Sequence, residues 1–226
     1  MKAGLVIAID GPAGSGKSTT ARLVAQRLGL FHLDTGAMYR AVTLKIITSG
    51  IDICNRQALE RLLKKTKVEL RWTKKGTRVY LDGKDVTEAI RKPEVSERVS
   101  EVSAIGCVRA AMVKEQRRLA KGKNVVCEGR DIGSVVFPFA QLKVFLDCAL
   151  EERARRRQKE LAGAAQGSPP SIEQVRRNLA KRDFIDSRRR LSPLHRVKDA
   201  VLVDTTHLTI EEQVGVVCSL AKPLLQ

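Results

Sequence analysis

The sequence lacks the cysteine and histidine patterns of a disulfide framework or a metal site. Its five cysteines are far apart, odd in number and without CxxC spacing, and its three histidines are scattered. Most of the cysteines lie in apolar stretches such as VVCEG and FLDCAL. We therefore expect reduced cysteines that serve packing in a cytoplasmic protein.

The chain also lacks a long apolar run near its start. The segment MKAGLVIAID has only a short apolar stretch before Asp10, too short for a signal peptide or a membrane span. We expect no membrane association, and we interpret Leu5 to Asp10 as a buried parallel strand.

Aromatic residues are scarce, and basic residues outnumber acidic ones. Aromatics make up 4% of the chain, and 42 Lys and Arg against 25 Asp and Glu give a formal net charge of +17. This positive charge is typical of a protein that binds nucleic acid or small nucleotides, and it is also compatible with a basic surface that is only solvated. A nucleic-acid surface needs a basic stripe with interleaved aromatics. Many basic residues instead fall in one segment at about 151–192, so we expect no nucleic-acid partner.

What the chain does contain is an alternation of strand and helix patterns. Residues 17–28 have a helical pattern that Gly29 ends, and a short strand at 31–33 leads into a helix from about 35 to 49. Further strands are expected at NVVCEG, LKVFLD and AVLVD, and further helices from Glu151 and from Thr209. This order predicts an α/β fold, a parallel sheet flanked by helices on both faces.

Two segments interrupt the alternation. Residues of about 55–105 contain the alternating runs VELRW and TRVYL, with Gly76 between them and the Asp82-Gly83 turn signal after the second. They predict a small inserted antiparallel lobe. The arginine-dense segment at about 151–192 is split by AGAAQGSPPS, which predicts two helices joined by a mobile loop.

The strongest motif follows the first strand. It matches GxxxxGK[ST] with one further threonine, and consists of Gly11, Pro12, Ala13, Gly14, Ser15, Gly16, Lys17, Ser18 and Thr19. Backbone N–H groups of such a P-loop surround phosphate oxygens at a helix N-terminus. We expect Lys17 to reach the β- and γ-phosphates of ATP and Ser18 to ligate Mg²⁺. A purely structural glycine turn is the alternative.

Two further segments follow strands, at the edge where α/β sheets bind ligands. In LDTGAMYR, Arg40 lies just over one helical turn beyond Thr35, so both residues can face one phosphate; alternatively Thr35 only caps the helix and Arg40 is solvated. In EGRDIG, Arg130 and Asp131 lie in a glycine-flanked loop. The alternative there is a surface turn with a local ion pair.

The arginine-dense segment resembles a lid. Arg153, Arg156 and Arg157 share one helix face, and Arg182, Asp186 and Arg189 share another. Charged helix faces are often only solvated, and Arg182 with Asp186 can be a simple i, i+4 pair. Arginines that close over a triphosphate would stabilise its charge and exclude water. The sequence shows no obvious catalytic His or Cys, as expected for transfer to a phosphate acceptor, which needs no strong base.

Together, GPAGSGKST, LDTGAMYRA, EGRDIGSVVFP and RDFIDSRRRLSPL resemble the bacterial type of cytidylate kinase, over essentially the whole chain. The resemblance implies transfer of the γ-phosphate of ATP·Mg²⁺ to CMP or dCMP by a monomer. It also implies one domain over 1–226: a core (1–40, 106–150, 193–226), an α+β nucleoside-monophosphate lobe (41–105) and a helical lid (151–192).

The resemblance also implies roles for individual residues. Lys17, Arg130, Arg153 and Arg157 would be catalytic, and Arg40 with Arg130 would bind the acceptor phosphate. The cytosine pocket would consist of Thr35, Arg109, Asp131 and Arg189, and the sugar would be held by Arg182 and Asp186. Arg109 lies in an amphipathic helix, and only the resemblance singles it out. Thr35 and Ser134 stand where some relatives have Ser and Thr.

Three other interpretations remain. A kinase for another small acceptor would share the core, although the insert and the GRDIG segment argue against it. A nucleic-acid-dependent ATPase would account for the charge. A nucleotide sensor without activity is the third, although Lys17 and the lid arginines are present.

Overall fold

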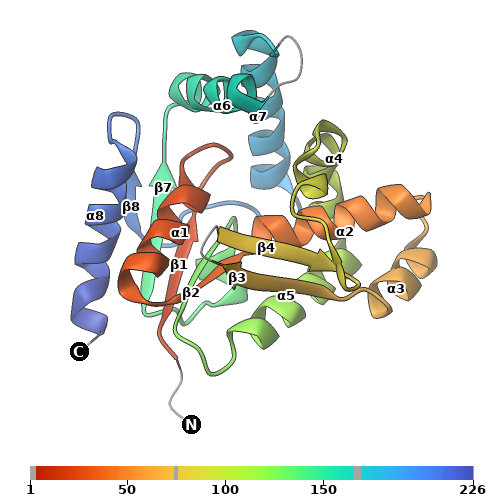
Figure 1. Cartoon of the computed structure of the whole chain (residues 1–226), viewed down its shortest axis with the longest axis horizontal. Helices are drawn as coiled ribbons and strands as arrows, with labels where there is room; N and C mark the ends of the chain where they lie inside the picture. The colour runs from red at the N-terminus through yellow and green to blue at the C-terminus, as the bar shows by residue number, and fades with distance from the viewer. Residues whose placement is uncertain (1–3, 74–75, 165–168, 226) are drawn as a thin grey trace.

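A five-stranded parallel sheet forms the centre of the computed structural model, which describes residues 4–73, 76–164 and 169–225. Its strand order is β2-β6-β1-β7-β8 (Figure 1). The strands are β1 (Val6–Asp10), β2 (Phe31–Asp34), β6 (Val125–Gly129), β7 (Leu142–Asp147) and β8 (Val201–Asp204). Neighbouring strands are parallel throughout. The predicted α/β fold is confirmed.

Apolar side chains on both faces of the strands explain why helices cover both sides of the sheet. Ile7 and Ile9 pack in one hydrophobic cluster with α1 (Lys17–Leu28) and α8 (Ile210–Ala221). Ala8, between them in sequence, packs in the other cluster, with α2 (Thr35–Ser49) and α5 (Gly106–Ala120). Successive strand residues point to opposite faces, so each strand contributes to both layers.

The inserted segment forms a lobe beside α2, and it is more helical than the sequence indicated. The antiparallel sheet β3-β4-β5 is present, formed by β3 (Val68–Thr73), β4 (Gly76–Leu81) and β5 (Lys84–Asp85). Around it lie α3 (Arg56–Lys64), the 3₁₀ turn η1 (Ala89–Arg91) and α4 (Pro93–Ala104). Leu59, Val79 and Ile90 of this lobe belong to the same hydrophobic cluster as Ala8 and Leu33 of the large sheet.

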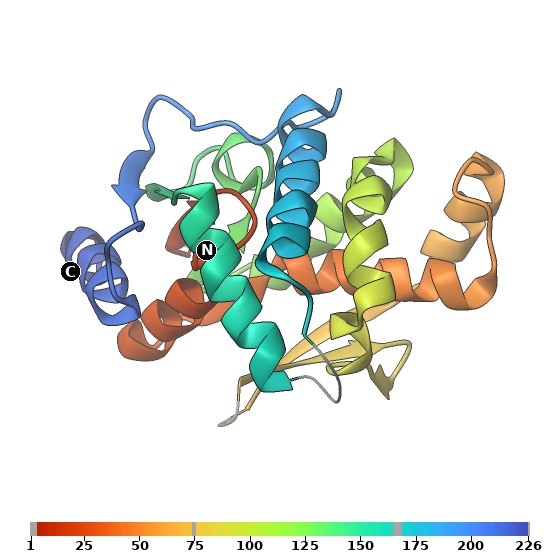
Figure 2. The ribbon, with the colours of Figure 1, turned by 90° about the horizontal axis from the view of Figure 1, so that it is seen from above.

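The arginine-dense segment folds into two helices beyond one end of the sheet, α6 (Leu150–Ala164) and α7 (Ile172–Arg188) (Figure 1). Seen from above, α7 lies between α6 and α4 (Figure 2). Both helices are as predicted, but the centre of the connecting segment, residues 165–168, lies outside the described residues. The remaining elements are the π-helical turn η2 (Ile132–Val136) and the 3₁₀ turn η3 (Lys222–Leu224).

The cysteines follow the prediction with one exception. All five are free, and Cys127, Cys148 and Cys218 are buried, whereas Cys54 is exposed and Cys107 is half-buried. Cys54 lies before α3 in a short connection, where no element covers it. Among the described helices, none combines the length and apolar character needed to cross a membrane.

Candidate active site

The site lies at the carboxyl ends of three neighbouring strands. Asp10 at the end of β1 pairs in register with Gly129 on β6, and Asp34 at the end of β2 pairs with Glu128. The segments that follow these strands are the P-loop, the start of α2 and the GRDIG turn, so the parallel register brings all three predicted motifs together.

The P-loop has the backbone geometry that its motif predicts. Gly16 is the N-cap of α1 with φ 90°, a left-handed conformation that favours glycine because it has no Cβ. Lys17 is buried, and its ammonium group donates hydrogen bonds to the carbonyl of Pro12 and to Ser15 Oγ, the latter at 3.2 Å. Burial, followed by the nearby charge of Arg130, holds the pKa of Lys17 well below its usual value. An anion in the loop would relieve this cost.

Ser18 has a partner that the sequence analysis missed. Its hydroxyl donates to Glu128 Oε2 at 2.6 Å, and the other carboxylate oxygen lies 3.1 Å from His32 Nε2. Glu128 is 3% exposed and His32 3%. Burial works to lower the pKa of His32, but the hydrogen bond and charge of Glu128 outweigh it and raise that pKa. The available signal was an acidic residue at the end of the apolar run VVCEG.

Between the carboxyl end of the sheet, α4 and α7 lies a cavity of about 70 Å³. Seven of the eight predicted acceptor residues line it: Thr35, Arg40, Arg130, Asp131, Arg182, Asp186 and Arg189. The lining also includes four side chains to which the sequence analysis gave no role: Tyr39, Val99, Ser100 and Ser103. The two serines come from α4, a helix that the sequence patterns did not predict.

Arg109 does not line the cavity but lies directly behind it. Its guanidinium forms an ion pair with Asp131 and donates to the carbonyl of Ser103 at 3.2 Å. Asp131 has a second partner in Arg189, at 3.3 Å. The interpretation of Arg130 and Asp131 as a local surface pair is therefore wrong, because each pairs with residues distant in sequence.

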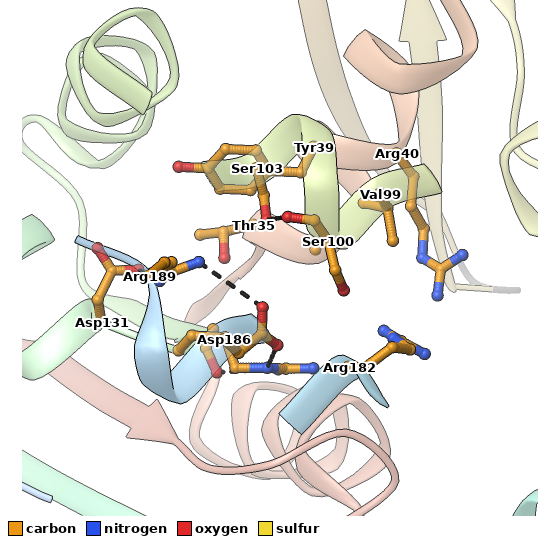
Figure 3. A pocket seen from close by; sticks show the side chains of 13 residues that line it. Thr35, Tyr39, Arg40, Val99, Ser100, Ser103, Asp131, Arg182, Asp186 and Arg189 are labelled. Carbon is orange, nitrogen blue, oxygen red and sulfur yellow. Dashed lines mark hydrogen bonds and ion pairs between the residues drawn. The ribbon is translucent and has the colours of Figure 1, made fainter. Parts of the chain in front are cut away.

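Asp186 pairs with Arg130 at 2.9 Å and with Arg189 at 3.8 Å, so the simple Arg182–Asp186 pair is also wrong. In Figure 3, Arg189 and Asp131 lie at one end of the cavity, and Arg40 and Arg182 lie at the other. Asp186 lies between these two ends.

The Arg40–Arg182 end carries more positive charge than the protein neutralises. Arg182 Nε is buried without a hydrogen-bond partner among the described residues. Burial first, then the charges of Arg130 and Arg40, lower the pKa of Arg182 to about 9; burial, then Arg157 and Arg130, lower the pKa of Arg40 to about 10. This end of the cavity is suited to an anion.

Thr35 and Arg40 are both held by specific contacts. The N-cap of α2 is Asp34, which accepts from the Ala37 nitrogen at 2.8 Å, so the capping interpretation of Thr35 is wrong. Thr35 is the first helical residue, and its hydroxyl donates to the Glu128 carbonyl at 2.6 Å. Arg40 is half-buried and donates to Ser96 Oγ at 2.8 Å, which contradicts the solvated alternative.

The lid arginines take different directions. Arg153 is buried and donates to the P-loop carbonyl of Ala13 at 2.9 Å and to Asp183 at 2.5 Å. Arg156 instead donates to the carbonyl of Thr205 at 2.7 Å, between β8 and α8. Arg157 pairs with Glu160 at 2.9 Å and lies close enough to the cavity to act on Arg40 and Arg182. Neither Arg153 nor Arg157 lines the cavity.

Comparison with known proteins agrees with the motifs. The family model described as cytidylate kinase matches residues 7–223. A cytidylate kinase of Caldanaerobacter subterraneus is 51% identical over 208 residues, covering 92% of this chain and 90% of the relative. A cytidylate kinase of Shouchella clausii is 46% identical over 222 residues, covering 98% of each chain.

Among solved structures, an uncharacterised protein of Eubacterium ventriosum matches with a TM-score of 0.52 at 9% identity, covering 97% of this chain and 98% of that one. This likeness concerns the fold alone. The family model and the relatives span nearly all of the chain, and the protein therefore belongs to the cytidylate kinase family.

Proposed function

We propose that the protein transfers the γ-phosphate of ATP to CMP or dCMP, giving ADP and CDP or dCDP. The observation that carries this proposal is the cavity itself. One end is a cluster of incompletely neutralised arginines, the other is the Arg109–Asp131–Arg189 cluster, and the P-loop lies at the adjacent strand end. A nucleoside monophosphate has the matching polarity, with a dianion at one end and a hydrogen-bonding base at the other.

In this proposal the acceptor phosphate binds Arg40 and Arg130. The sugar is held by Asp186 and Arg182, whose carboxylate and guanidinium lie midway along the cavity and toward its cationic end (Figure 3). An acceptor phosphate already presents an anionic oxygen to the γ-phosphorus, so the site needs to align and desolvate the reactants rather than remove a proton.

The cytosine edge faces Asp131, with Arg189 and Thr35 beside it and Arg109 behind Asp131, where it holds that carboxylate. Cytosine offers an amino donor at C4, which an ionised carboxylate accepts. Uracil presents an oxygen at that position, which would leave Asp131 facing another acceptor. A buried group left unpaired in this way gives strong discrimination.

The triphosphate of ATP is proposed to bind the P-loop, residues 11–19, with Lys17 at its β- and γ-phosphates. The pair of Ser18 Oγ and Glu128 Oε2, 2.6 Å apart, fits Mg²⁺, which prefers one or two protein oxygens completed by phosphate oxygens. Ser18 would hold the ion, and the ion would neutralise charge on the phosphates.

The lid supplies the remaining charge for the transfer. Arg153 is anchored against the P-loop and Arg157 lies near the cationic end of the cavity. We propose that both guanidinium groups stabilise the transferring phosphoryl group, together with Lys17 and Arg130, while the closed lid excludes water that would hydrolyse ATP.

We further propose that the protein acts as a cytoplasmic monomer without a nucleic-acid partner. Five free cysteines, three of them buried, support a reducing compartment. The proposed division is a core (1–40, 106–150, 193–226), an acceptor lobe (41–105) and a lid (151–192).

The test is ADP release measured with ATP·Mg²⁺ and each of CMP, dCMP, UMP, AMP and GMP, beside a Lys17→Ala variant. We expect the fastest turnover with CMP or dCMP and its loss in the variant. ATP hydrolysis that no nucleotide acceptor stimulates, but that DNA or RNA does, would overturn the proposal in favour of a nucleic-acid-dependent ATPase.

A further inference from the structure

A buried histidine that the sequence analysis set aside lies between the phosphate site and the inserted lobe. His32 is the second residue of β2, 3% exposed, and its side chain reaches both neighbouring structures. Nε2 lies 3.1 Å from Glu128 Oε1, and Nδ1 lies 3.4 Å from Thr77 Oγ1 on β4. Neither the motifs nor the proposed reaction uses this residue.

The contacts form a continuous path to the P-loop. The carboxylate of Glu128 uses one oxygen for His32 and the other for Ser18 Oγ, at 2.6 Å. A carboxylate has one torsion that sets both oxygens at once, so the partner of the first oxygen fixes the direction of the second. His32 therefore determines where Glu128 Oε2 points, and through it the direction of the Ser18 hydroxyl.

Among the described residues, His32 is the only side chain hydrogen-bonded to Oε1 of Glu128. Asp34 lies in register with Glu128, the two carboxylates repel each other, and Asp34 Oδ1 accepts from the Ala37 nitrogen. Without the imidazole donor, the carboxylate would turn away from Asp34 or toward Lys17, which also acts on it electrostatically. We expect either motion to weaken the 2.6 Å contact to Ser18.

We propose that His32 is a positioning residue for the nucleotide–metal site: its Nε2–H group holds the Glu128 carboxylate so that the opposite oxygen orients the Ser18 hydroxyl. This inference rests on the proposed function, in which Ser18 holds the ion that accompanies ATP. Partners that orient a ligand of a metal are worth roughly 10- to 100-fold in metal affinity. The effect should appear in metal–nucleotide binding and leave binding at the acceptor cavity unchanged.

Two substitutions of His32 by an amide side chain test its contacts to Glu128 and to Thr77 one at a time. The amide nitrogen of His32→Gln can occupy the place of Nε2 and donate to Glu128. The shorter His32→Asn has its amide near the place of Nδ1, so it can reach Thr77 but not Glu128. Both variants are polar and similar in bulk, so a general loss of packing would affect them alike. Thr43 on α2 is buried like His32, and its hydroxyl donates to the Tyr39 carbonyl away from the nucleotide site. Thr43→Val therefore serves as a control for a general loss of protein stability.

The measurement is Mn²⁺ binding in the presence of ADP, followed by the EPR signal of free Mn²⁺, with CMP binding measured by calorimetry in parallel. We expect His32→Asn to weaken Mn²⁺·ADP binding by about tenfold or more. His32→Gln should stay within about threefold of wild type, and Thr43→Val should match wild type. All variants should bind CMP with unchanged affinity.

Equal Mn²⁺·ADP binding by wild type and His32→Asn would overturn the positioning role, as would equal weakening in His32→Asn and His32→Gln. Both results leave the proposed function standing if wild type still phosphorylates CMP. Conversely, a wild type that binds Mn²⁺·ADP but phosphorylates no cytidine nucleotide contradicts the proposed function. The comparison of the two His32 variants remains decisive in that case.

Discussion

Asp183 Oδ1, on the second lid helix, lies 3.1 Å from the backbone nitrogen of Ala13 in the P-loop. The other oxygen of Asp183 accepts from Arg153 at 2.5 Å, and Arg153 in turn donates to the Ala13 carbonyl at 2.9 Å. One P-loop residue is therefore held through both its N–H and its carbonyl by a carboxylate and a guanidinium from different lid helices. This clasp fixes the position of Arg153 relative to the phosphate site.

Weakening the clasp should slow catalysis more than it weakens acceptor binding. Asp183→Asn keeps an oxygen for the Ala13 nitrogen but loses the charge that holds Arg153. A charge-assisted hydrogen bond is worth about 1.5–3 kcal/mol, so we expect kcat to fall roughly 10- to 100-fold, with the KM for CMP nearly unchanged. Steady-state kinetics measure both constants. A variant that raises the KM for CMP at constant kcat would show that Asp183 does not act through Arg153.

Base selection should depend on Asp131. Asp131→Asn keeps the shape of the side chain but introduces an amide that can donate to uracil. We expect kcat/KM for CMP to fall by roughly 100-fold and the preference for CMP over UMP to shrink by at least as much. Competing turnover of the two nucleotides measures the ratio. A uniform loss for both, with an unchanged ratio, would mean that Asp131 serves only to balance Arg109 and Arg189.

Replacing Arg182 should have opposite effects on the two functions of the site, raising the thermal stability of the free protein and weakening the binding of CMP. Arg182→Met deletes a guanidinium whose Nε has no partner among the described residues. The KM for CMP should rise roughly 10- to 100-fold because the acceptor loses a charged hydrogen-bond donor. The Tm without ligand should rise, since a desolvated charge repelled by Arg40 and Arg130 is gone. Arg155→Met, on the exposed face of α6, is the control and should change neither; a fall in Tm for Arg182→Met would contradict the prediction.

Asp10 should make stability depend on pH. Its carboxylate accepts from the Ile132 and Gly133 nitrogens, each at 2.8 Å. Burial, offset by these two hydrogen bonds, raises its pKa from 3.8 to about 6. The native state therefore holds a proton that the unfolded chain has released, and stability falls as the pH rises from about 4 to about 6, then levels off.

The non-titrating Asp10→Asn variant isolates this contribution. Urea unfolding of wild type and variant between pH 4.5 and 8 should show wild type losing stability relative to the variant by up to about 3 kcal/mol. The loss should be complete near pH 7. A difference that stays constant over this range would show that Asp10 ionises at its ordinary pKa.

The parts of the site that could be predicted are those whose residues are close together in the sequence. The P-loop was predictable because its function needs consecutive residues, with glycine where φ is positive and Lys17 at the helix start. The partners of Asp186 could not be predicted. The helical spacing indicates Arg182, whereas in the fold Asp186 pairs with Arg130, which follows the end of β6. Contacts between residues distant in sequence therefore determined the partners of Asp186, and the spacing within its own helix did not.

Glu128 and His32 show the same limit more sharply. Glu128 is the one polar side chain of β6, and His32 is one of two polar residues in the short strand β2. Only the parallel register of these two strands brings them within 3.1 Å. Arg109 was marked only through family resemblance, since its helix face looks solvated in sequence but packs behind Asp131. For the fold, apolar periodicity sufficed for the sheet but underestimated the helices of the insert.

The shared hydrophobic cluster means that the inserted lobe is not a detachable module. Leu59, Val79 and Ile90 pack in the same cluster as Ala8 and Leu33, and deleting residues 55–105 would expose the apolar sides of α2 and α5 that the lobe covers rather than shorten a loop. A smaller kinase could not be engineered from this chain by truncation alone. It would need new side chains to close the exposed layer, and the lobe and sheet should unfold as one cooperative unit.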